Sequence, residues 1–213
     1  MGREFNELFD QWSHSYDNTV SGKDPEYEEV FLHYDEILSK VADSSMGTVV
    51  EFGVGTGNLT NKLMKRRLTV FGMEPSEGMR KIAQEKLPDV RIFDGDFLNF
   101  PNVSESIDTF VSTYAFHHLT DKEKEIAIGK YSKLLKEGGR VVFADTVFAT
   151  EEAKRGMIQD AKGKGYNRLA EDLEREYYTT ISVLQDLFNQ NSFSVTFTKL
   201  NPFVWLIDAK KIK

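Results

Sequence analysis

The sequence predicts a single α/β domain with a mostly parallel sheet of seven strands, a C-terminal antiparallel hairpin and an N-terminal helical cap. Between residues 48 and 144, short apolar runs alternate with amphipathic segments, a pattern typical of a parallel sheet covered by helices on both faces. Near the C-terminus, two strand-like runs follow each other around Asn201-Pro202, which favours a hairpin. Ahead of residue 48, apolar residues recur every three or four positions, the period of a helix.

Length and composition restrict the class of protein. A chain of 213 residues is long enough to bury the core of one domain without disulfides or metal ions. Its net charge of −7 disfavours a phosphate backbone, so we expect no nucleic-acid partner. The absence of cysteine excludes a disulfide framework and thiolate ligands, and we assign no metal-binding residue. No apolar run suggests a secretory signal or a membrane span, so we expect a cytoplasmic protein.

The helical cap, residues 1–46, is predicted to contain two helices. The apolar residues of the first extend to Tyr16, and those of the second run from Val30 to Val41. Residues 17–25 are polar and are expected to form the loop between them. Trp12 and Tyr16 share one helical face, which is consistent with core packing and also with closure over a bound ligand.

The predicted core, residues 47–150, contains five strand-like runs. They are Thr48–Phe52, Leu68–Met73, Val90–Phe93, Thr109–Thr113 and Arg140–Ala144. Asn58 and Ser76 are the predicted N-caps of two helices, and Thr120 begins a third helix with a capping box. We expect that third helix to end near Lys136.

The rest of the chain divides into residues 151–180 and residues 181–213. The first part is highly charged and is predicted to be helical on both sides of a break near Gly163. The second part begins with a short helix and ends in the hairpin, whose first strand alternates apolar and polar residues from Phe193 onward.

A glycine-rich loop directly follows the first predicted strand. Gly53, Gly55 and Gly57 allow a ligand to approach the backbone at a helix N-terminus. A dinucleotide site places its third glycine where this chain has Asn58, and it favours an apolar residue where this chain has Glu51. S-adenosylmethionine carries an ammonium and a sulfonium, so a carboxylate at this loop favours that cofactor over NAD.

Two further acidic positions follow predicted strands. Glu74 comes after the second strand, where a carboxylate accepts hydrogen bonds from ribose hydroxyls of NAD and S-adenosylmethionine alike. Asp96 and Phe97 follow the third strand, where an acid can accept from an adenine amino group and an aromatic ring can pack on the base. The alternative interpretation of these acids is that Asp94 or Asp96 caps a tight turn.

The ordered motifs of this chain resemble those of class I S-adenosylmethionine-dependent methyltransferases, which have a Rossmann-like sheet. The motifs are Glu51–Gly57, Glu74, Asp96-Phe97, Ala115–Leu119 and Leu134–Arg140, with Phe9–Trp12 and Tyr16-Asp17 similar to the N-terminal cap of the small-molecule branch. More closely, the chain resembles a group of small, uncharacterised bacterial methyltransferases associated with methionine-to-cysteine conversion.

The resemblance implies a set of contacts with the cofactor, S-adenosyl-L-methionine. Gly53, Gly55 and Gly57 would line its methionine part, Glu51 its ammonium, Glu74 the ribose, Asp96 and Phe97 the adenine, and Tyr114 and Ala115 the sulfonium; Tyr16 is added from the cap. The family also commonly inserts a lid over the acceptor pocket at the place of residues 151–180, although a charge run of this kind is more often a solvated helical face.

Methyl transfer is an in-line displacement, so the protein mainly aligns the nucleophile and excludes water. His117 is the predicted catalytic residue, because it follows the fourth strand and titrates near neutral pH. His118 is a second candidate. The alternative to a catalytic role is that both histidines only shape the turn before Thr120. Asp145, after the fifth strand, is a predicted polar wall.

The sequence therefore predicts a methyltransferase acting on a small-molecule acceptor that it does not identify. A non-catalytic protein that binds S-adenosylmethionine or S-adenosylhomocysteine remains an alternative, and an NAD-dependent oxidoreductase is a less favoured one. The oligomeric state is not predicted.

Overall fold

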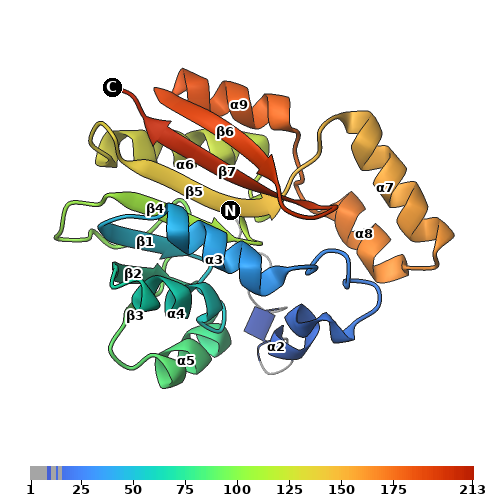
Figure 1. The fold of residues 1–213 in the computed structure, drawn as a ribbon, viewed down its shortest axis with the longest axis horizontal. Coiled ribbons are helices and arrows are strands. Elements are labelled where there is room, and N and C mark those ends of the chain that lie inside the picture. Colours follow the sequence, from blue (N-terminus) through green and yellow to red (C-terminus); the bar gives the residue numbers. More distant parts are fainter. Residues whose placement is uncertain (1–8, 11–12, 14–15) are drawn as a thin grey trace.

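The computed structural model describes residues 9–10, 13 and 16–213, which form one sheet with helices on both faces (Figure 1). The sheet has seven strands in the order β3-β2-β1-β4-β5-β7-β6. They are β1 (Thr48–Phe52), β2 (Thr69–Met73), β3 (Arg91–Phe93), β4 (Thr109–Thr113), β5 (Arg140–Thr146), β6 (Phe193–Lys199) and β7 (Val204–Lys211). β7 runs antiparallel to β5 and β6, and the remaining neighbours are parallel. The predicted fold class is confirmed.

The helices follow the order expected from the sequence. They are α2 (Tyr16–Asn18), the π-helix η2 (Thr19–Lys23), α3 (Tyr34–Ser44), α4 (Asn58–Lys65), α5 (Glu77–Lys86), the 3-10 turn η3 (Phe116–His118), α6 (Asp121–Leu134), α7 (Glu151–Gly163), α8 (Asn167–Arg175) and α9 (Ile181–Gln190). None of them is long and apolar enough to cross a membrane.

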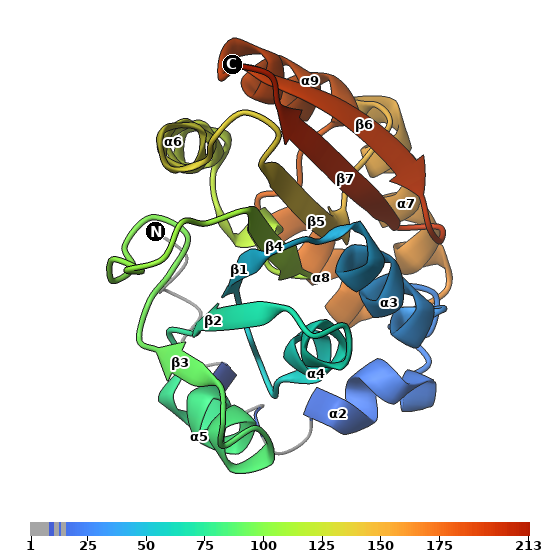
Figure 2. The same cartoon turned by 60° about the vertical axis from the view of Figure 1, so that its left-hand side comes forward.

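Two hydrophobic layers sandwich the sheet because its strands point alternate side chains to opposite faces. In β1, Val50 packs in the layer of α6 and α9, whereas Val49 packs in the layer of α3 and α4. In β5, Phe143 packs in the first of these layers and Ala144 in the second. Figure 2 shows α6 and α9 on one side of the sheet and α3 and α4 on the other.

Local capping signals set most helix boundaries as predicted. The Ser76 hydroxyl accepts a hydrogen bond from the Met79 N–H at 3.2 Å, and Thr120 forms both bonds of its capping box. The prediction for Asn58 was wrong: Gly57, at φ 88°, occupies the N-cap position and Asn58 is the first helical residue. α6 ends at Leu134, two residues before the predicted end.

The cap departs most from the prediction. α3 begins at Tyr34 rather than near Val30, and His33 ahead of it has a left-handed backbone at φ 62°. The predicted loop at residues 17–25 contains the end of α2 and all of η2. Most of the predicted first helix, including Trp12, lies outside the described residues.

Candidate active site

A cavity opens at the carboxyl ends of β1, β2, β4 and β5, the edge where parallel α/β sheets bind ligands. Its lining comes from three parts of the chain: the cap, the loops after the strands, and the segment around the end of α8. The predicted site residues that line it are Tyr16, Gly53, Gly55, Glu74, Asp96, Phe97, Tyr114, Ala115 and His117. Glu51 and Gly57, which were also predicted as cofactor contacts, do not line it.

The glycine loop has a backbone that side chains would obstruct. Gly53 has φ 67°, and a Cβ added there would lie 2.9 Å from the Cβ of Ala115. The N–H of Gly55 donates to Oε2 of Glu74 at 2.8 Å. The loop after β1 is therefore fastened directly to the carboxylate after β2.

Glu74 lies buried between two loop segments. Its Oε1 accepts the N–H of Ser76 at 2.9 Å, so each carboxylate oxygen has a backbone donor. Burial nevertheless raises the pKa of Glu74 to about 7. A carboxylate fixed in this way at a strand end is placed to meet hydroxyl groups of a ligand in the cavity.

Asp96 and Phe97 form the wall after β3. Oδ1 of Asp96 accepts the N–H groups of Leu98 and Asn99 at 2.9 and 2.8 Å, so the turn-capping interpretation holds for this residue, which also lines the cavity. The ring of Phe97 packs 5.1 Å from the Phe52 ring in the core.

Glu51 and Gly57 support the loop from behind. Glu51 is 1% exposed, and Oε2 accepts the Thr60 hydroxyl at 2.7 Å. Burial raises the pKa of Glu51 to about 8, and the neighbouring Glu74 adds to this rise. A Cβ on Gly57 would lie 2.8 Å from Cδ1 of Leu87, so this glycine serves the packing between α4 and the end of α5.

The cap is held to the loops by two carboxylates that the sequence analysis did not select as site residues. Asp17 accepts the Thr56 hydroxyl and the Lys86 ammonium, both at 2.6 Å. Asp10 accepts the N–H of Gly78 at 3.0 Å, at the start of α5. Both aspartates belong to the cap motifs Phe9–Trp12 and Tyr16-Asp17, and this membership was the sequence signal that could have identified them.

Tyr114 and Ala115 follow β4 at the centre of the cavity wall. Tyr114 has φ 54°, a left-handed conformation that is unfavourable for a bulky residue. Its ring lies 5.1 Å from that of Phe31 and 5.6 Å from that of Tyr34. The cap therefore packs directly on the strained residue beside the glycine loop.

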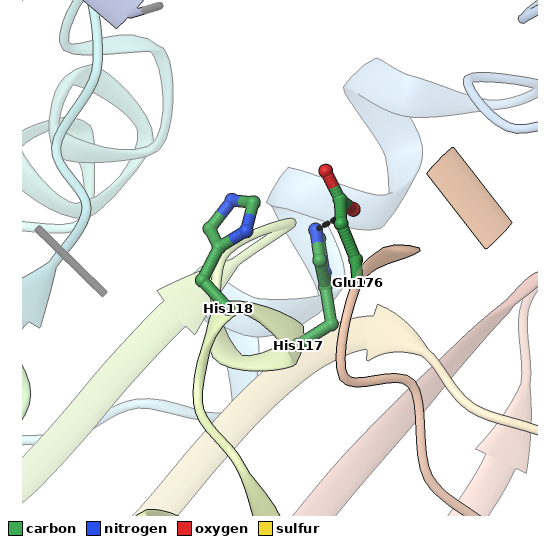
Figure 3. Close-up of side chains that lie close together, drawn as sticks. All are labelled: His117, His118 and Glu176. Carbon is green, nitrogen blue, oxygen red and sulfur yellow. Dashed lines mark ion pairs between the residues drawn. The ribbon is translucent and has the colours of Figure 1, made fainter. Parts of the chain in front are cut away.

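His117 lies between two carboxylates. Its Nδ1 is 2.6 Å from Oδ1 of Asp145, and its Nε2 is 3.3 Å from Oε2 of Glu176. Its backbone N–H also donates to Oδ2 of Asp145 at 2.9 Å. Asp145 thus orients the imidazole from β5. Figure 3 shows Glu176 meeting the same ring from the loop after α8.

The loop after α8 is fixed on this histidine turn by several contacts that the sequence did not reveal. The Tyr178 ring stacks on that of His117 at 4.6 Å, and its hydroxyl donates to Oε2 of Glu176 at 2.7 Å. The buried ammonium of Lys124 donates to the carbonyl of Tyr177 at 2.7 Å. Glu176 lies far from the histidines in sequence and belongs to a charged stretch, so no local pattern distinguishes it.

The charges at this end of the cavity are set by their partners. Burial lowers the pKa of His117, but Asp145 and Glu176 outweigh this and raise it to about 10. Burial and the charge of His117 lower the pKa of His118 to about 3. Burial raises the pKa of Glu176, yet its bond to His117 brings that pKa down to about 2. At neutral pH a cationic His117 therefore lies beside a neutral His118.

Comparison with known proteins agrees with this architecture. The family described as a methyltransferase domain matches residues 49–139. A Bacillus mycoides protein named as an uncharacterized methyltransferase is 58% identical over 212 residues, which cover 99% of this chain and 100% of the relative. A Bacillus anthracis protein with the same description has the same identity and coverage.

Solved structures share the fold at low identity. Magnesium protoporphyrin IX methyltransferase from Synechocystis PCC 6803, with bound S-adenosylhomocysteine, has a TM-score of 0.74 at 16% identity and covers 99% of this chain and 100% of its own. A possible histamine N-methyltransferase from Thermotoga maritima has a TM-score of 0.67 at 20% identity, with coverages of 97% and 99%.

The sequence relatives, the matched domain and the geometry of the cavity agree on one family. The chain is similar to methyltransferases along nearly its whole length, and residues of four of the five ordered motifs line one cavity at the carboxyl edge of its sheet. This protein belongs to the S-adenosylmethionine-dependent methyltransferases.

Proposed function

We propose that this protein transfers the methyl group of S-adenosylmethionine to a small molecule by in-line displacement, within the cavity at the carboxyl edge of the sheet. The observation that most supports this proposal is the continuity of the cavity. Its lining runs from the glycine loop and Glu74 to His117 and Glu176 without leaving one pocket. A cofactor at the first end and an acceptor at the second would therefore lie in one pocket, as in-line transfer between them requires.

The proposed cofactor contacts follow the lining residues. Gly53 and Gly55 would face the methionine part, Glu74 the ribose hydroxyls, and Asp96 with Phe97 the adenine. Tyr114, Ala115 and Tyr16 would surround the reactive sulfur; they too line the cavity. Gly57 would contribute to the cofactor site indirectly, because its packing against Leu87 positions α4.

Glu51 requires a revised role in this proposal. Because it lies behind the loop and outside the cavity lining, we propose that it supports the loop through its bond with Thr60, without direct contact with the ammonium.

The charge of the lining also favours this cofactor. Four carboxylates line the cavity, those of Glu74, Asp96, Asp172 and Glu176, and Arg175 is the cationic lining residue among those described apart from the histidine turn. Arg175 itself pairs with Asp172 at 2.8 Å. An acidic cavity attracts the cationic sulfonium more strongly than the uncharged thioether that remains after methyl transfer.

At the acceptor end we propose that Nε2 of His117 contacts the nucleophilic atom of the acceptor. That nitrogen faces Glu176 in the structure, so acceptor binding would exchange or share this contact. The segment 151–180 would act as a lid in the single domain, since it supplies Asp172, Arg175, Glu176 and Tyr178 to the lining. The lid also meets the cap, because Arg168 pairs with Glu26 at 3.0 Å.

The identity of the acceptor cannot be inferred from the solved structures. One neighbour is named for magnesium protoporphyrin IX and another for possible histamine methylation, so the same fold serves unlike acceptors. We propose a small-molecule acceptor in the cytoplasm. The net charge of −7 supports this class over nucleic acid.

Methyl-labelled S-adenosylmethionine, incubated with the protein and a metabolite extract, tests the proposed reaction. The expected result is one dominant labelled small molecule formed together with an equal amount of S-adenosylhomocysteine. Cofactor binding without any labelled product across extracts would instead favour the non-catalytic alternative.

Thermal unfolding with added ligand tests the cofactor separately. S-adenosylhomocysteine at about 100 times its Kd should stabilise the protein by about 2.7 kcal/mol, whereas NAD should not. Stabilisation by NAD alone would favour the oxidoreductase alternative.

A further inference from the structure

Three side chains at the acceptor end of the cavity form a cluster of potential metal ligands, which methyl transfer alone does not explain. His117, His118 and Glu176 each present one potential ligand atom, and these three atoms all lie within 4.8 Å of one another. Figure 3 shows the three side chains converging from two segments, the turn η3 and the loop after α8. All three line the cavity.

We propose that these three side chains bind one divalent transition-metal ion, such as Zn²⁺, which holds a hydroxyl oxygen of the acceptor. The proposal rests on the proposed methyl transfer for its purpose, but not for the site itself. With the metal bound, Nε2 of His117 would act on the acceptor through the ion instead of contacting it directly. The metal site is defined by donor atoms that are present whether or not the cofactor binds.

The spacing of the donors suits one ion after a small adjustment. Zinc bonds to imidazole nitrogen and carboxylate oxygen are about 2.0 to 2.2 Å long, so two ligands of one ion lie roughly 3 to 4 Å apart. The three donor atoms would have to approach one another by up to about 1 to 2 Å, which side-chain rotation allows. The contact between His117 and Glu176, now 3.3 Å, would be replaced by two bonds to the metal, and the proton on Nε2 of His117 would be released to solvent as the metal binds.

The donor types indicate which metals fit. Two imidazoles and one carboxylate suit Zn²⁺, Co²⁺, Fe²⁺ or Mn²⁺, whereas Mg²⁺ and Ca²⁺ prefer a shell of oxygens. Three protein ligands also leave at least one coordination position open, as catalytic metal sites do. Because the donors line the cavity, that open position would face the acceptor.

Outer hydrogen bonds hold two of the three ligands in place. Asp145, which is 2% exposed, contacts Nδ1 of His117 at 2.6 Å and leaves Nε2 directed at the cluster. The Tyr178 hydroxyl holds Oε2 of Glu176 at 2.7 Å. A carboxylate behind a ligating histidine is the usual support of metal sites, since it fixes the ring and increases its basicity.

The electrostatic surroundings favour a dication at this end. Asp172 lies on α8 and Glu176 just beyond it, and Asp145 approaches from β5. Arg175 pairs with Asp172 at 2.8 Å and lies 3.8 Å from Glu176, and the buried Lys124 ammonium donates to the carbonyl of Tyr177. The carboxylates offset the repulsion between a metal ion and the sulfonium of the cofactor.

The metal gives the reaction a defined substrate class, acceptors that carry a hydroxyl group. Coordination of the hydroxyl oxygen lowers its pKa, and its proton passes to solvent. The oxygen lone pair then forms the new O–CH₃ bond while the S–CH₃ bond breaks. The electron pair of that bond remains on sulfur, which leaves S-adenosylhomocysteine as a neutral thioether.

Calorimetric titration of the chelator-treated protein with metal chlorides tests the site directly. Zn²⁺ and Co²⁺ should each bind with one ion per chain, and Mg²⁺ should bind at least about 100-fold more weakly. Bound Co²⁺ should also show visible absorption far stronger than that of the hydrated ion. Failure of both Zn²⁺ and Co²⁺ to bind would overturn the proposal.

Matched variants connect the binding to these side chains. Glu176→Gln and His118→Ala should each weaken Zn²⁺ binding by more than about 100-fold, and Asp145→Asn by about 10 to 100-fold. Glu174→Gln and His33→Gln, at exposed positions elsewhere, should leave it unchanged. Unchanged Zn²⁺ affinity in both Glu176→Gln and His118→Ala would contradict the assignment, and Glu176→Gln, which is nearly isosteric, decides if His118→Ala fails to fold.

Cofactor binding is measured separately on the same samples. If Zn²⁺ fails to bind while S-adenosylhomocysteine still binds, the metal proposal fails and the proposed function stands. If Zn²⁺ binds at these residues but S-adenosylhomocysteine does not, the proposed function fails and the metal site stands.

Discussion

The two ends of the cavity, which our proposal assigns to the cofactor and to the acceptor, are built in different ways. At the cofactor end, most of the chemistry comes from backbone groups in short contiguous motifs, as when the N–H groups of Gly55 and Ser76 hold the Glu74 carboxylate. At the acceptor end, side chains from distant parts of the chain meet, as His117, Asp145 and Glu176 do. The first end depends mainly on backbone groups of short motifs that follow neighbouring strands, and the second depends on side chains that the assembled fold brings together.

This difference suggests why one fold serves unlike acceptors, as the names of the solved neighbours indicate. A motif that folds locally keeps its geometry when the rest of the chain changes. A site assembled from a lid and two strand ends changes with any one of them. The two ends should therefore respond differently to substitution, and four experiments test that expectation.

Gly53→Ala should have the largest effect. The left-handed backbone and the contact with Ala115, 2.9 Å from the added Cβ, should together destabilise the protein by about 3 kcal/mol. Cofactor binding should weaken as well. Gly138→Ala is a matched control, since it has φ 87° but open space around its Cβ, and should cost only about 1 kcal/mol in urea unfolding. Equal losses in the two variants would show that close approach at the loop is unimportant.

Glu51→Gln should change how stability depends on pH. The folded-state pKa of Glu51, about 8, is above the value of about 4.3 in an unfolded chain. The folded protein therefore binds the extra proton between these pH values, and Glu51 reduces stability as pH rises through that window. The stability of Glu51→Gln relative to wild type should increase by on the order of 3 kcal/mol from pH 4.5 to pH 9.

Denaturant unfolding across pH measures this effect. The exposed Glu125→Gln on α6 serves as the control and should show no such trend. If the difference in unfolding free energy between Glu51→Gln and wild type did not change with pH, Glu51 would be ionised in the folded protein throughout this range. That result would contradict the effect expected from its burial.

Glu74→Ala should weaken S-adenosylhomocysteine binding by more than tenfold, about 1.4 kcal/mol, because the loop loses the acceptor for the Gly55 N–H and the ribose loses its partner. Glu77→Ala removes an exposed acid at the start of α5 and should change the affinity less than about twofold. Isothermal titration calorimetry distinguishes these results, and wild-type affinity in Glu74→Ala would remove this residue from the cofactor end.

Tyr178→Phe should have the smallest effect and sharpens the comparison. Loss of the hydroxyl that donates to Glu176 should cost about 1 kcal/mol of stability. Because this bond belongs to the acceptor end, the affinity for S-adenosylhomocysteine should stay at the wild-type value. A parallel loss of cofactor affinity would show that the two ends are coupled.

Sequence patterns predicted the sheet well because its strands are buried runs with clear boundaries. β1 and β4 have the predicted bounds, and β5 extends two residues further to Thr146. Ser76 and Thr120 were identified correctly because their hydroxyls interact within three residues along the chain.

Errors arose where tertiary contacts outweigh local preference. Asn58 donates to Asp17 instead of capping α4, and Phe31 is apolar because it packs on Tyr114, not because it belongs to a helix. Glu176 was not predicted because its partner His117 is brought to it only by the fold. Glu51 was correctly recognised as unusual, yet its position behind the loop depends on Thr60 of the next helix.

A crystal structure with bound S-adenosylhomocysteine tests the assignment of the two ends most directly. The account predicts that the ribose hydroxyls contact Glu74, that the adenine lies against Asp96 and Phe97, and that the sulfur points towards His117. Adenine found beside His117 and Glu176, or a ligand bound outside this cavity, would contradict it.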